Sequence, residues 1–206
     1  MERQTPVSPP GKLKIINAMR TLLENRTFES LTISEIAVTA GVTEGLIYKY
    51  FKDKRDLLHH VLKEHYQLFL VQIERDLQGI DGALNKLKKI IWSSIERYAN
   101  HRVFARIILL EVRNSEEYFQ SEAYDLVRRF NHIIIDIINE GIAAGEIRED
   151  LPAGYIRNAI FGTIEHSCLN RVIFNETVST NDAAKLITDL LFHGIKRSCN
   201  GSLPSL

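Results

Sequence analysis

The chain has 206 residues, 45% of them hydrophobic, so it can bury the core of one large or two small domains. Its 26 Lys and Arg balance its 26 Asp and Glu, which excludes a strongly basic surface that binds nucleic acid through charge alone. No segment approaches the ~20 apolar residues of a membrane span, and no secretory signal begins the chain. The composition therefore predicts a soluble, cytoplasmic protein that does not bind a membrane.

The beginning of the chain is predicted to form a flexible arm followed by a helix. Residues 1–10 contain Pro6, Pro9 and Pro10 and are expected to form a flexible arm, as residues 200–206 are expected to form a tail. Between Leu13 and about Asn25 apolar residues recur at helical spacing, which predicts a first helix.

Residues 32–54 carry the most informative pattern in the chain. Thr32 followed by Glu35 is a capping box, Gly41 allows the left-handed backbone of a sharp turn, and Thr43 can cap a second short helix. The inward positions of the two helices are Ile33, Ile36, Ala37, Leu46 and Ile47. This spacing of small residue, glycine and hydrophobic residue predicts a helix-turn-helix that docks on DNA.

The same stretch resembles the DNA-binding domain of the TetR family of bacterial transcriptional regulators. The resemblance covers residues 12–60 and is carried by Leu31-Thr32, Ile36-Ala37, Gly41-Val42-Thr43, Ile47-Tyr48-Lys49-Tyr50-Phe51-Lys52 and Lys54. It implies an all-α chain of about nine helices, with a three-helix DNA-binding domain over residues 11–60. A larger helical domain for ligand binding and dimerisation would then span residues 61–199. The implied partners are a palindromic double-stranded operator, a second copy of the chain and an apolar small-molecule effector.

The second helix of a helix-turn-helix enters the major groove, so its exposed side chains contact DNA. Residues 1–60 hold nine Lys and Arg against seven Asp and Glu, which indicates a few placed phosphate contacts. Lys54, which resembles the family's lysine at that place, is expected to bind phosphate. The predicted DNA-binding residues are Thr32, Thr43, Glu44, Gly45, Tyr48, Lys49, Tyr50 and Lys54.

Three residues of this helix have alternative interpretations. Tyr48 could pack mainly in the core instead of contacting phosphate. Glu44 could accept a hydrogen bond from a cytosine amino group or limit affinity for nonspecific DNA. Leu46, placed inward here, could contact only a thymine methyl group.

The rest of the chain has almost continuous helical periodicity. The predicted helices span about residues 53–78, 81–98, 103–112, 122–144, 153–173 and 182–197. Asp53 and Asp81 open the first two of these helices, and Thr180 or Asn181 caps the last. Residues 133–135 are also compatible with a strand, but the flanking periodicity favours a helix. The domain boundary is expected inside the helix over 53–78, near residue 60.

A second resemblance concerns the predicted ligand-binding domain. The segments 110–115, 140–147 and 160–165 are similar to TetR-type regulators of fatty-acid degradation, which are repressors released by long-chain acyl-coenzyme A. The resemblance implies that the effector is a long-chain acyl-CoA and that the protein needs no cofactor.

The residues of two predicted helices are compatible with such a ligand. An acyl chain needs an apolar tunnel, and a coenzyme A head group needs cations, which Arg102, Arg106, Arg113, Arg128 and Arg129 could supply at its mouth. The alternative is an ordinary core with solvated arginines. The predicted pocket residues are Phe104, Arg106, Ile107, Ile108, Arg113, Phe130, Ile134 and Phe161.

Specific affinity for DNA requires two copies of a helix-turn-helix. By the resemblance, the helices over 153–173 and 182–197 form the dimer interface. The predicted interface residues are Ile156, Ile160, Ile164, Leu186 and Leu190, which would equally fit an ordinary core face.

The other reactive side chains form no convincing catalytic or metal site. No nucleophile–base spacing and no phosphate-binding glycine loop is present, so we expect no enzyme activity. His60 and Glu64 lie one turn apart, but two ligands on a charged helix are expected to be solvated. Cys168 and Cys199 are expected to be reduced, with a redox switch as the alternative. Trp92 is expected in the core, with a ligand contact as its alternative.

The sequence therefore predicts a ligand-responsive, DNA-binding transcriptional repressor, and the second resemblance implies that its targets are genes of fatty-acid metabolism. Three other interpretations remain open. The chain could be a TetR-type regulator of an efflux or other catabolic operon with a different apolar ligand, a ligand-free dimeric regulator, or a helical enzyme with a catalytic group around His166 and Glu165.

Overall fold

A computed structural model describes residues 9–174, 176 and 179–195 of the chain. These residues form ten α-helices and no strand, which confirms the predicted all-α fold, with one helix more than expected. The predicted tail, Cys199 and residues 1–8 of the predicted arm lie outside the described residues. No helix in the described part is long and apolar enough to cross a membrane.

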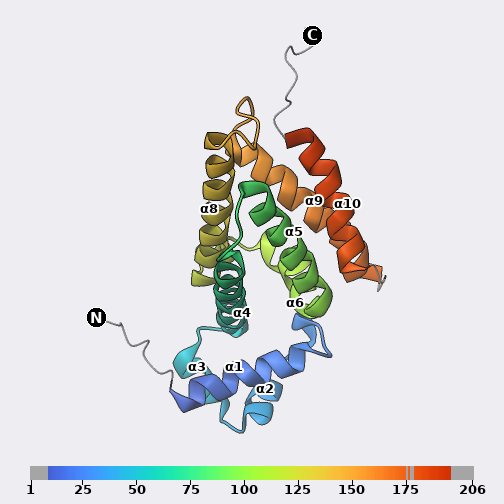
Figure 1. The fold of residues 1–206 in the computed structure, drawn as a ribbon. Helices are drawn as coiled ribbons and strands as arrows, with labels where there is room; N and C mark the ends of the chain where they lie inside the picture. The colour runs from blue at the N-terminus through green and yellow to red at the C-terminus, as the bar shows by residue number, and fades with distance from the viewer. Residues whose placement is uncertain (1–8, 175, 177–178, 196–206) are drawn as a thin grey trace, which may run out of the picture.

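The helices form a small group at one end of the molecule and a larger bundle above it (Figure 1). The small group contains α1 (Pro10–Leu23), α2 (Ile33–Ala40) and α3 (Glu44–Tyr50). From it α4 (Lys54–Leu77) rises into the larger bundle. The remaining helices are α5 (Ala83–Asn100), α6 (Arg102–Arg106), α7 (Glu116–Phe119), α8 (Glu122–Ala143), α9 (Ala153–Phe174) and α10 (Thr180–Ile195).

The helix-turn-helix forms as its capping residues predict. The Thr32 side chain accepts a hydrogen bond from the Glu35 backbone N–H, and the Glu35 carboxylate accepts one from the Thr32 N–H at 2.9 Å. Gly41, with φ of 65°, ends α2 in the left-handed conformation, and Thr43 caps α3. A hydrogen bond from Arg26, at 2.6 Å, is the main reason that the pKa of Glu35 falls to about 2.

The predicted helix over 103–112 is wrong in its detail, because the segment is divided into three short pieces. After α6 the backbone makes a π-helical turn over Ile107–Glu111 and then a 3₁₀ turn over Val112–Asn114. A π turn adds a residue to the helical repeat and changes the direction of the side chains that follow. Apolar periodicity in the sequence does not report this change.

Two predicted caps are also wrong. The helix α5 begins at Ala83 rather than Asp81, because the distant Glu146 carboxylate accepts hydrogen bonds from the Ala83 and Leu84 N–H groups, both at 3.2 Å. The Ser179 side chain, and not Thr180 or Asn181, accepts the Asp182 N–H at the start of α10, at 3.3 Å.

Two large hydrophobic cores stabilise the molecule, and α4 contributes to both. The first core contains buried residues of α1, α2 and α3, together with Val61 and Leu62 of α4. Phe104 of α6 and Ile107 of the π turn after it also belong to this core. The second joins the distal half of α4, from Phe69 onwards, to α5, α8, α9 and α10. Because the first core continues past residue 60, the predicted domain boundary does not coincide with a gap in packing.

Gly141 allows α8 to approach the start of α5 closely. A Cβ atom at this position would lie 2.6 Å from the Ala83 Cβ and 2.7 Å from the Ile147 Cδ1. These distances are much shorter than an ordinary van der Waals contact, and both neighbouring side chains are buried.

We therefore expect Gly141→Ala to lower the free energy of unfolding by about 1–3 kcal/mol. Chemical denaturation followed by circular dichroism would measure the change. Gly154→Ala is the matched control, because a Cβ there meets no atom within 4 Å. Equal stability of the two variants would contradict the close crossing.

Candidate DNA-binding surface and ligand cavity

The recognition helix α3 is attached to the first core by one face and exposes the other. Ile47 is fully buried, and Leu46 packs partly against the same core, so a base contact by Leu46 is not supported. The side chains that lie on the exposed face belong to Thr43, Glu44, Tyr48 and Lys49, with Gly45 between them. These residues lie where a helix in the major groove would meet base edges and phosphates.

The two tyrosines of α3 have different environments. Tyr48 is 55% exposed, so its alternative as a core residue is wrong. Tyr50 packs partly against the first core and makes an edge contact with Phe51. Tyr48 is therefore the better placed of the two for a phosphate contact.

Lys54 has a role that the sequence analysis did not predict. Its ammonium group donates hydrogen bonds to the carbonyl oxygens of Leu31 at 2.7 Å and Phe28 at 3.0 Å, and it lies 4.5 Å from the centre of the Phe28 ring. A third carbonyl, that of Glu29, is 3.4 Å away. The predicted phosphate contact is corrected accordingly, because these carbonyls engage the donors that would bind a phosphate.

Lys54→Ala is therefore expected to destabilise the DNA-binding domain, by about 1–3 kcal/mol, through loss of hydrogen bonds made by a charged donor. Lys49→Ala, which removes an exposed cation, should leave stability unchanged and weaken DNA binding. Thermal melting and DNA-binding titrations at several salt concentrations would separate these effects. An unchanged melting temperature for Lys54→Ala would contradict the role assigned here.

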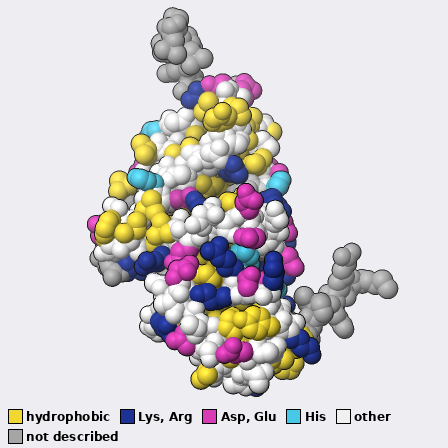
Figure 2. Space-filling model, turned by 180° about the vertical axis from the view of Figure 1, so that it is seen from behind, with side chains coloured by type: hydrophobic (Ala, Val, Ile, Leu, Met, Phe, Trp, Pro, Cys, Tyr) yellow, Lys and Arg dark blue, Asp and Glu magenta, His cyan; other side chains and the backbone are white. Residues whose placement is uncertain are grey.

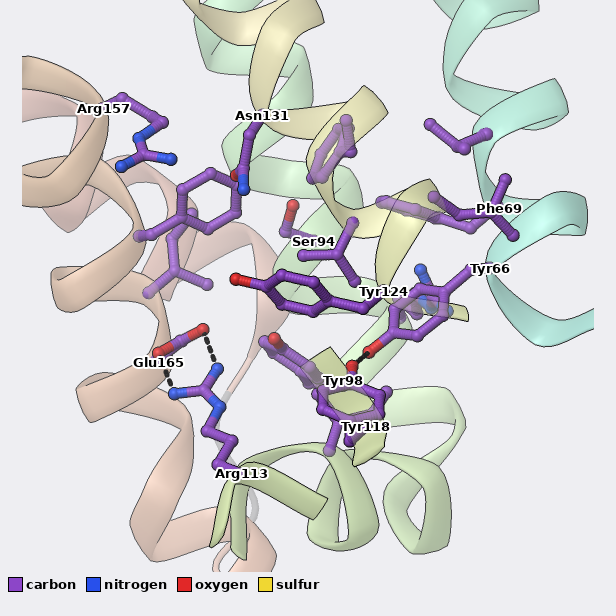
Figure 3. A pocket seen from close by; sticks show the side chains of 18 of the residues that line it. Tyr66, Phe69, Ser94, Tyr98, Arg113, Tyr118, Tyr124, Asn131, Arg157 and Glu165 are labelled. Atoms are coloured by element: carbon purple, nitrogen blue, oxygen red, sulfur yellow. Dashed lines mark hydrogen bonds and ion pairs between the residues drawn. The ribbon is translucent and has the colours of Figure 1, made fainter. Parts of the chain in front are cut away.

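The larger bundle contains a partly open cavity of about 350 Å³, within the size range of small-molecule sites. Its walls come from α4, α5, α8 and α9 and from the irregular segment that precedes α8, as Figure 3 shows. Aromatic and aliphatic side chains make up much of the lining: Tyr66, Phe69, Leu70, Tyr98, Ile108, Tyr118, Phe119, Tyr124, Leu126, Val127, Phe130, Phe161 and Ile164. The cavity argues against the alternative of a ligand-free regulator with a filled interior.

Half of the predicted pocket residues line this cavity. Ile108, Arg113, Phe130 and Phe161 do so. The other four predictions are wrong. Phe104 and Ile107 belong to the first core, and Ile134 is buried in the second. Arg106 is exposed beside Glu111. The π turn after α6 accounts for part of this error, because it decides which side chains of 107–113 face inward.

Two polar pairs connect the walls of the cavity (Figure 3). Arg113 donates two hydrogen bonds to the Glu165 carboxylate, at 2.8 and 2.5 Å, and this contact raises the pKa of Arg113. The hydroxyl groups of Tyr66 and Tyr118 are 2.9 Å apart and hydrogen-bonded. Burial raises the pKa of both phenols, so they remain neutral donors and acceptors.

Arg97 is a cation in the cavity wall that forms no ion pair with a described carboxylate. Its guanidinium lies 4.1 Å from the centre of the Phe69 ring and 5.0 Å from that of Tyr66. Its Nε donates to His65 Nε2 at 2.9 Å, so that nitrogen carries no proton. Burial, and then the charge of Arg97, lowers the pKa of His65 to about 2.

This pair predicts acid sensitivity. His65 titrates near 6.5 in the unfolded chain and only at about 2 in the folded one. Its contribution to stability is therefore complete above pH 6.5 and is lost as the pH falls towards 2. His65→Gln, which keeps an acceptor for Arg97 without a titrating group, should reduce the fall in melting temperature between pH 7.5 and pH 5.5, roughly one unit on either side of that unfolded pKa. His132→Gln, on an exposed part of α8, is the control.

The expected cluster of head-group arginines is not present. Only Arg113 of the five lines the cavity, whereas Arg106 faces Glu111, Arg128 pairs with Asp125, Arg129 pairs with Glu74 at 2.6 Å, and Arg102 donates to the Val172 carbonyl. Arg97 and Arg157, which the sequence predictions did not include, both line the cavity. The signal for Arg97 was available, because Ser94 and Arg97 continue the apolar stripe of Leu87 and Ile91 at helical spacing.

Only part of the predicted dimer interface is available to a second copy. Ile156, Ile160 and Ile164 are 0–2% exposed and belong to the second core, so their assignment to an interface is corrected. Leu186 and Leu190 on α10 are 69% and 71% exposed. Other exposed apolar side chains on α9 are Tyr155, Ile173 and Phe174. Figure 2 shows hydrophobic side chains gathered on the flank where α9 and α10 lie.

The remaining reactive residues make no site in the described part of the chain. Cys168 is buried, and burial raises its pKa to about 11, which disfavours a redox switch at this thiol. No group of three or more metal-ligating side chains occurs among the described residues. Trp92 donates to the Asn181 side chain at 2.7 Å and joins α5 to α10, as a structural rather than a ligand-contacting residue.

Comparisons with known proteins agree with this architecture. Residues 15–61 match the family model described as bacterial regulatory proteins, tetR family, and residues 62–194 match the model of the YsiA-like protein C-terminal region. The chain belongs to the TetR family. The prediction of a ligand-responsive, DNA-binding transcriptional repressor is confirmed at this level.

Individual relatives include a regulator of fatty-acid metabolism. The fatty acid metabolism regulator protein of Bacillus subtilis is 30% identical over 186 residues, which cover 90% of this chain and 96% of that protein. The structure of FadR from B. subtilis in complex with stearoyl-CoA is similar with a TM-score of 0.78 and 31% identity, over 89% of this chain and 98% of that one. The repressor KstR2 of Mycolicibacterium smegmatis is 24% identical over 79% of this chain and 80% of its own length.

Proposed function

We propose that this TetR family member is a repressor of fatty-acid metabolism genes, released from its operator by a long-chain acyl-CoA. The observation that carries the proposal is the cavity of about 350 Å³ with a largely apolar and aromatic lining. It lies in the part of the chain that is similar to a regulator solved with stearoyl-CoA. An acyl chain would fill the apolar space, and the arginines in the wall would attract an anionic head group.

The helix α4 would transmit ligand binding to DNA. Tyr66, Phe69 and Leu70 on α4 line the cavity. Two residues before Tyr66, Glu64 of α4 forms an ion pair with Arg20 of α1, at 2.5 Å. A ligand that displaces α4 would therefore move the DNA-binding domain, which we assign to residues 11–60, relative to the ligand-binding domain over residues 61–199.

A dimer makes this movement effective. Successive major grooves on one side of DNA are about 34–36 Å apart, so two recognition helices must keep that spacing. We propose that α9 and α10 pair with those of a second copy through exposed apolar residues that include Leu186 and Leu190. The recognition helices would contact the operator through Thr43, Glu44, Gly45, Tyr48 and Lys49, with Thr32 at the start of α2.

Operator release can be measured directly. Operator sequences would be selected in vitro from random DNA, and fluorescence anisotropy would follow binding in the presence of stearoyl-CoA or coenzyme A alone. We expect stearoyl-CoA to weaken DNA binding about 100-fold, a coupling of about 2.7 kcal/mol. Coenzyme A alone should have little effect, because it lacks the acyl chain. Unchanged DNA binding at saturating stearoyl-CoA would contradict the proposal.

The dimer interface has a separate test. The double variant Leu186→Glu and Leu190→Glu should dissociate the dimer and weaken operator binding, because it buries charges at an apolar contact. Light scattering coupled to gel filtration would give the oligomeric state. Leu68→Glu, at a residue on α4 that is equally exposed at 69%, is the matched control. A double variant that remains dimeric would place the interface elsewhere.

A further inference from the structure

One part of the cavity wall presents polar groups that have no hydrogen-bond partner among the described residues. Ser94 is 6% exposed, lines the cavity, and its Oγ has no hydrogen-bond partner among the described residues. Arg157 also lines the cavity, and its Nε is buried without a partner. Buried polar atoms almost always have a partner, so two such atoms on one cavity require an explanation.

Three helices bring these groups to the same region. Ser94 lies on α5, Asn131 on α8 and Arg157 on α9, and each of these helices packs against the other two. Figure 3 shows the Asn131 and Arg157 side chains extending into the same side of the cavity, away from the Arg113–Glu165 pair. The Asn131 side chain has no hydrogen bond within the described protein.

No described residue balances the charge at this place. Arg113 is neutralised by Glu165, but Arg157 forms no ion pair with a described carboxylate. Its only hydrogen bond to a described residue is from a terminal nitrogen to the neutral Asn158 side chain, at 2.5 Å. A serine hydroxyl, an amide NH₂ and a guanidinium are all hydrogen-bond donors, so the group that they fit is an oxygen acceptor.

We propose that Ser94, Asn131 and Arg157 form a subsite that binds the acyl oxygen of the ligand. This inference rests on the proposed function and specifies it further. In an acyl-CoA the acceptor is the thioester carbonyl oxygen, and in a free fatty acid it is the carboxylate. Either acceptor would satisfy the unpartnered donors, while the hydrocarbon chain lies against the apolar wall that contains Phe69 and Phe130.

The test compares three lipids of equal chain length by calorimetric titration of the full chain. Stearoyl-CoA contains the thioester carbonyl, the S-stearyl thioether of coenzyme A has a methylene group in place of that carbonyl, and stearate contains a carboxylate. Wild-type protein should bind stearoyl-CoA about 10- to 100-fold more tightly than the thioether, as expected for a hydrogen bond from a charged donor. In Arg157→Leu and in Asn131→Leu this ratio should fall towards one.

Controls separate a loss of the subsite from a loss of the fold. Arg129→Leu, at an arginine of α8 that does not line the cavity, should keep the wild-type ratio. Circular dichroism and ligand-free operator binding should be unchanged in every variant. If Arg157→Leu does not fold, Asn131→Leu provides the comparison, because its side chain has nearly the size of the one it replaces.

The relative affinities for the three lipids distinguish the subsite from the proposed function. Equal wild-type affinity for the thioester and the thioether, with tight binding of both, would overturn the subsite and leave the proposed function intact. Tight, Arg157-dependent binding of stearate but not of stearoyl-CoA would support the subsite and identify a free fatty acid as its ligand. If none of the three lipids binds while operator binding is intact, both proposals are overturned.

Discussion

The residues Lys54–Leu77 form one helix without a break, and both hydrophobic cores pack against it. At 1.5 Å per residue its 24 residues span ~36 Å, a length similar to the spacing of major grooves on DNA. An uninterrupted helix of this kind moves largely as a rigid body. In the proposed mechanism, a small displacement where Tyr66 and Phe69 face the cavity would therefore reach the DNA-binding domain, to which Glu64 and Lys54 attach the same helix.

The cavity wall carries positive charge that a site for a purely apolar ligand would not need. Three arginines line it, and one carboxylate, Glu165, neutralises only Arg113. Arg97 is held by His65 and by two aromatic rings, whereas the buried Nε of Arg157 is left without a partner. Uncompensated cations in a protein wall are costly unless a ligand supplies the acceptor. This arrangement favours a lipid with an oxygen-containing or anionic group over a pure hydrocarbon.

Local interactions account for most of what could be predicted before the fold was known. The capping box of Thr32 and Glu35, the left-handed Gly41 and the cap at Thr43 involve residues within a few positions of one another. The same is true of the buried Ile36 and Ile47. Such features depend on short-range geometry, and they were enough to place a helix-turn-helix and to indicate the family.

Several errors involve partners that are distant in the sequence, whereas the π turn over Ile107–Glu111 and the Ser179 cap of α10 are local. The carbonyls that receive Lys54 lie more than twenty residues away from it, and the carboxylate that caps α5 comes from Glu146. Periodicity shows that Ile160 and Leu190 each lie on an apolar stripe, but it does not show that the first faces its own core and the second faces solvent. That distinction depends on which helices pack together.

The sequence by itself determined the helical content, the helix-turn-helix and the membership of a regulator family, because capping residues and apolar periodicity act over short stretches of chain. Only the tertiary structure decided which residues of Ile107–Asn114 face the cavity, which arginines keep a free hydrogen-bonding group there, and which apolar residues remain available for a second copy. The physical reason is that burial and electrostatic pairing belong to neighbours in space, and the packing of α4, α5, α8 and α9 selects those neighbours.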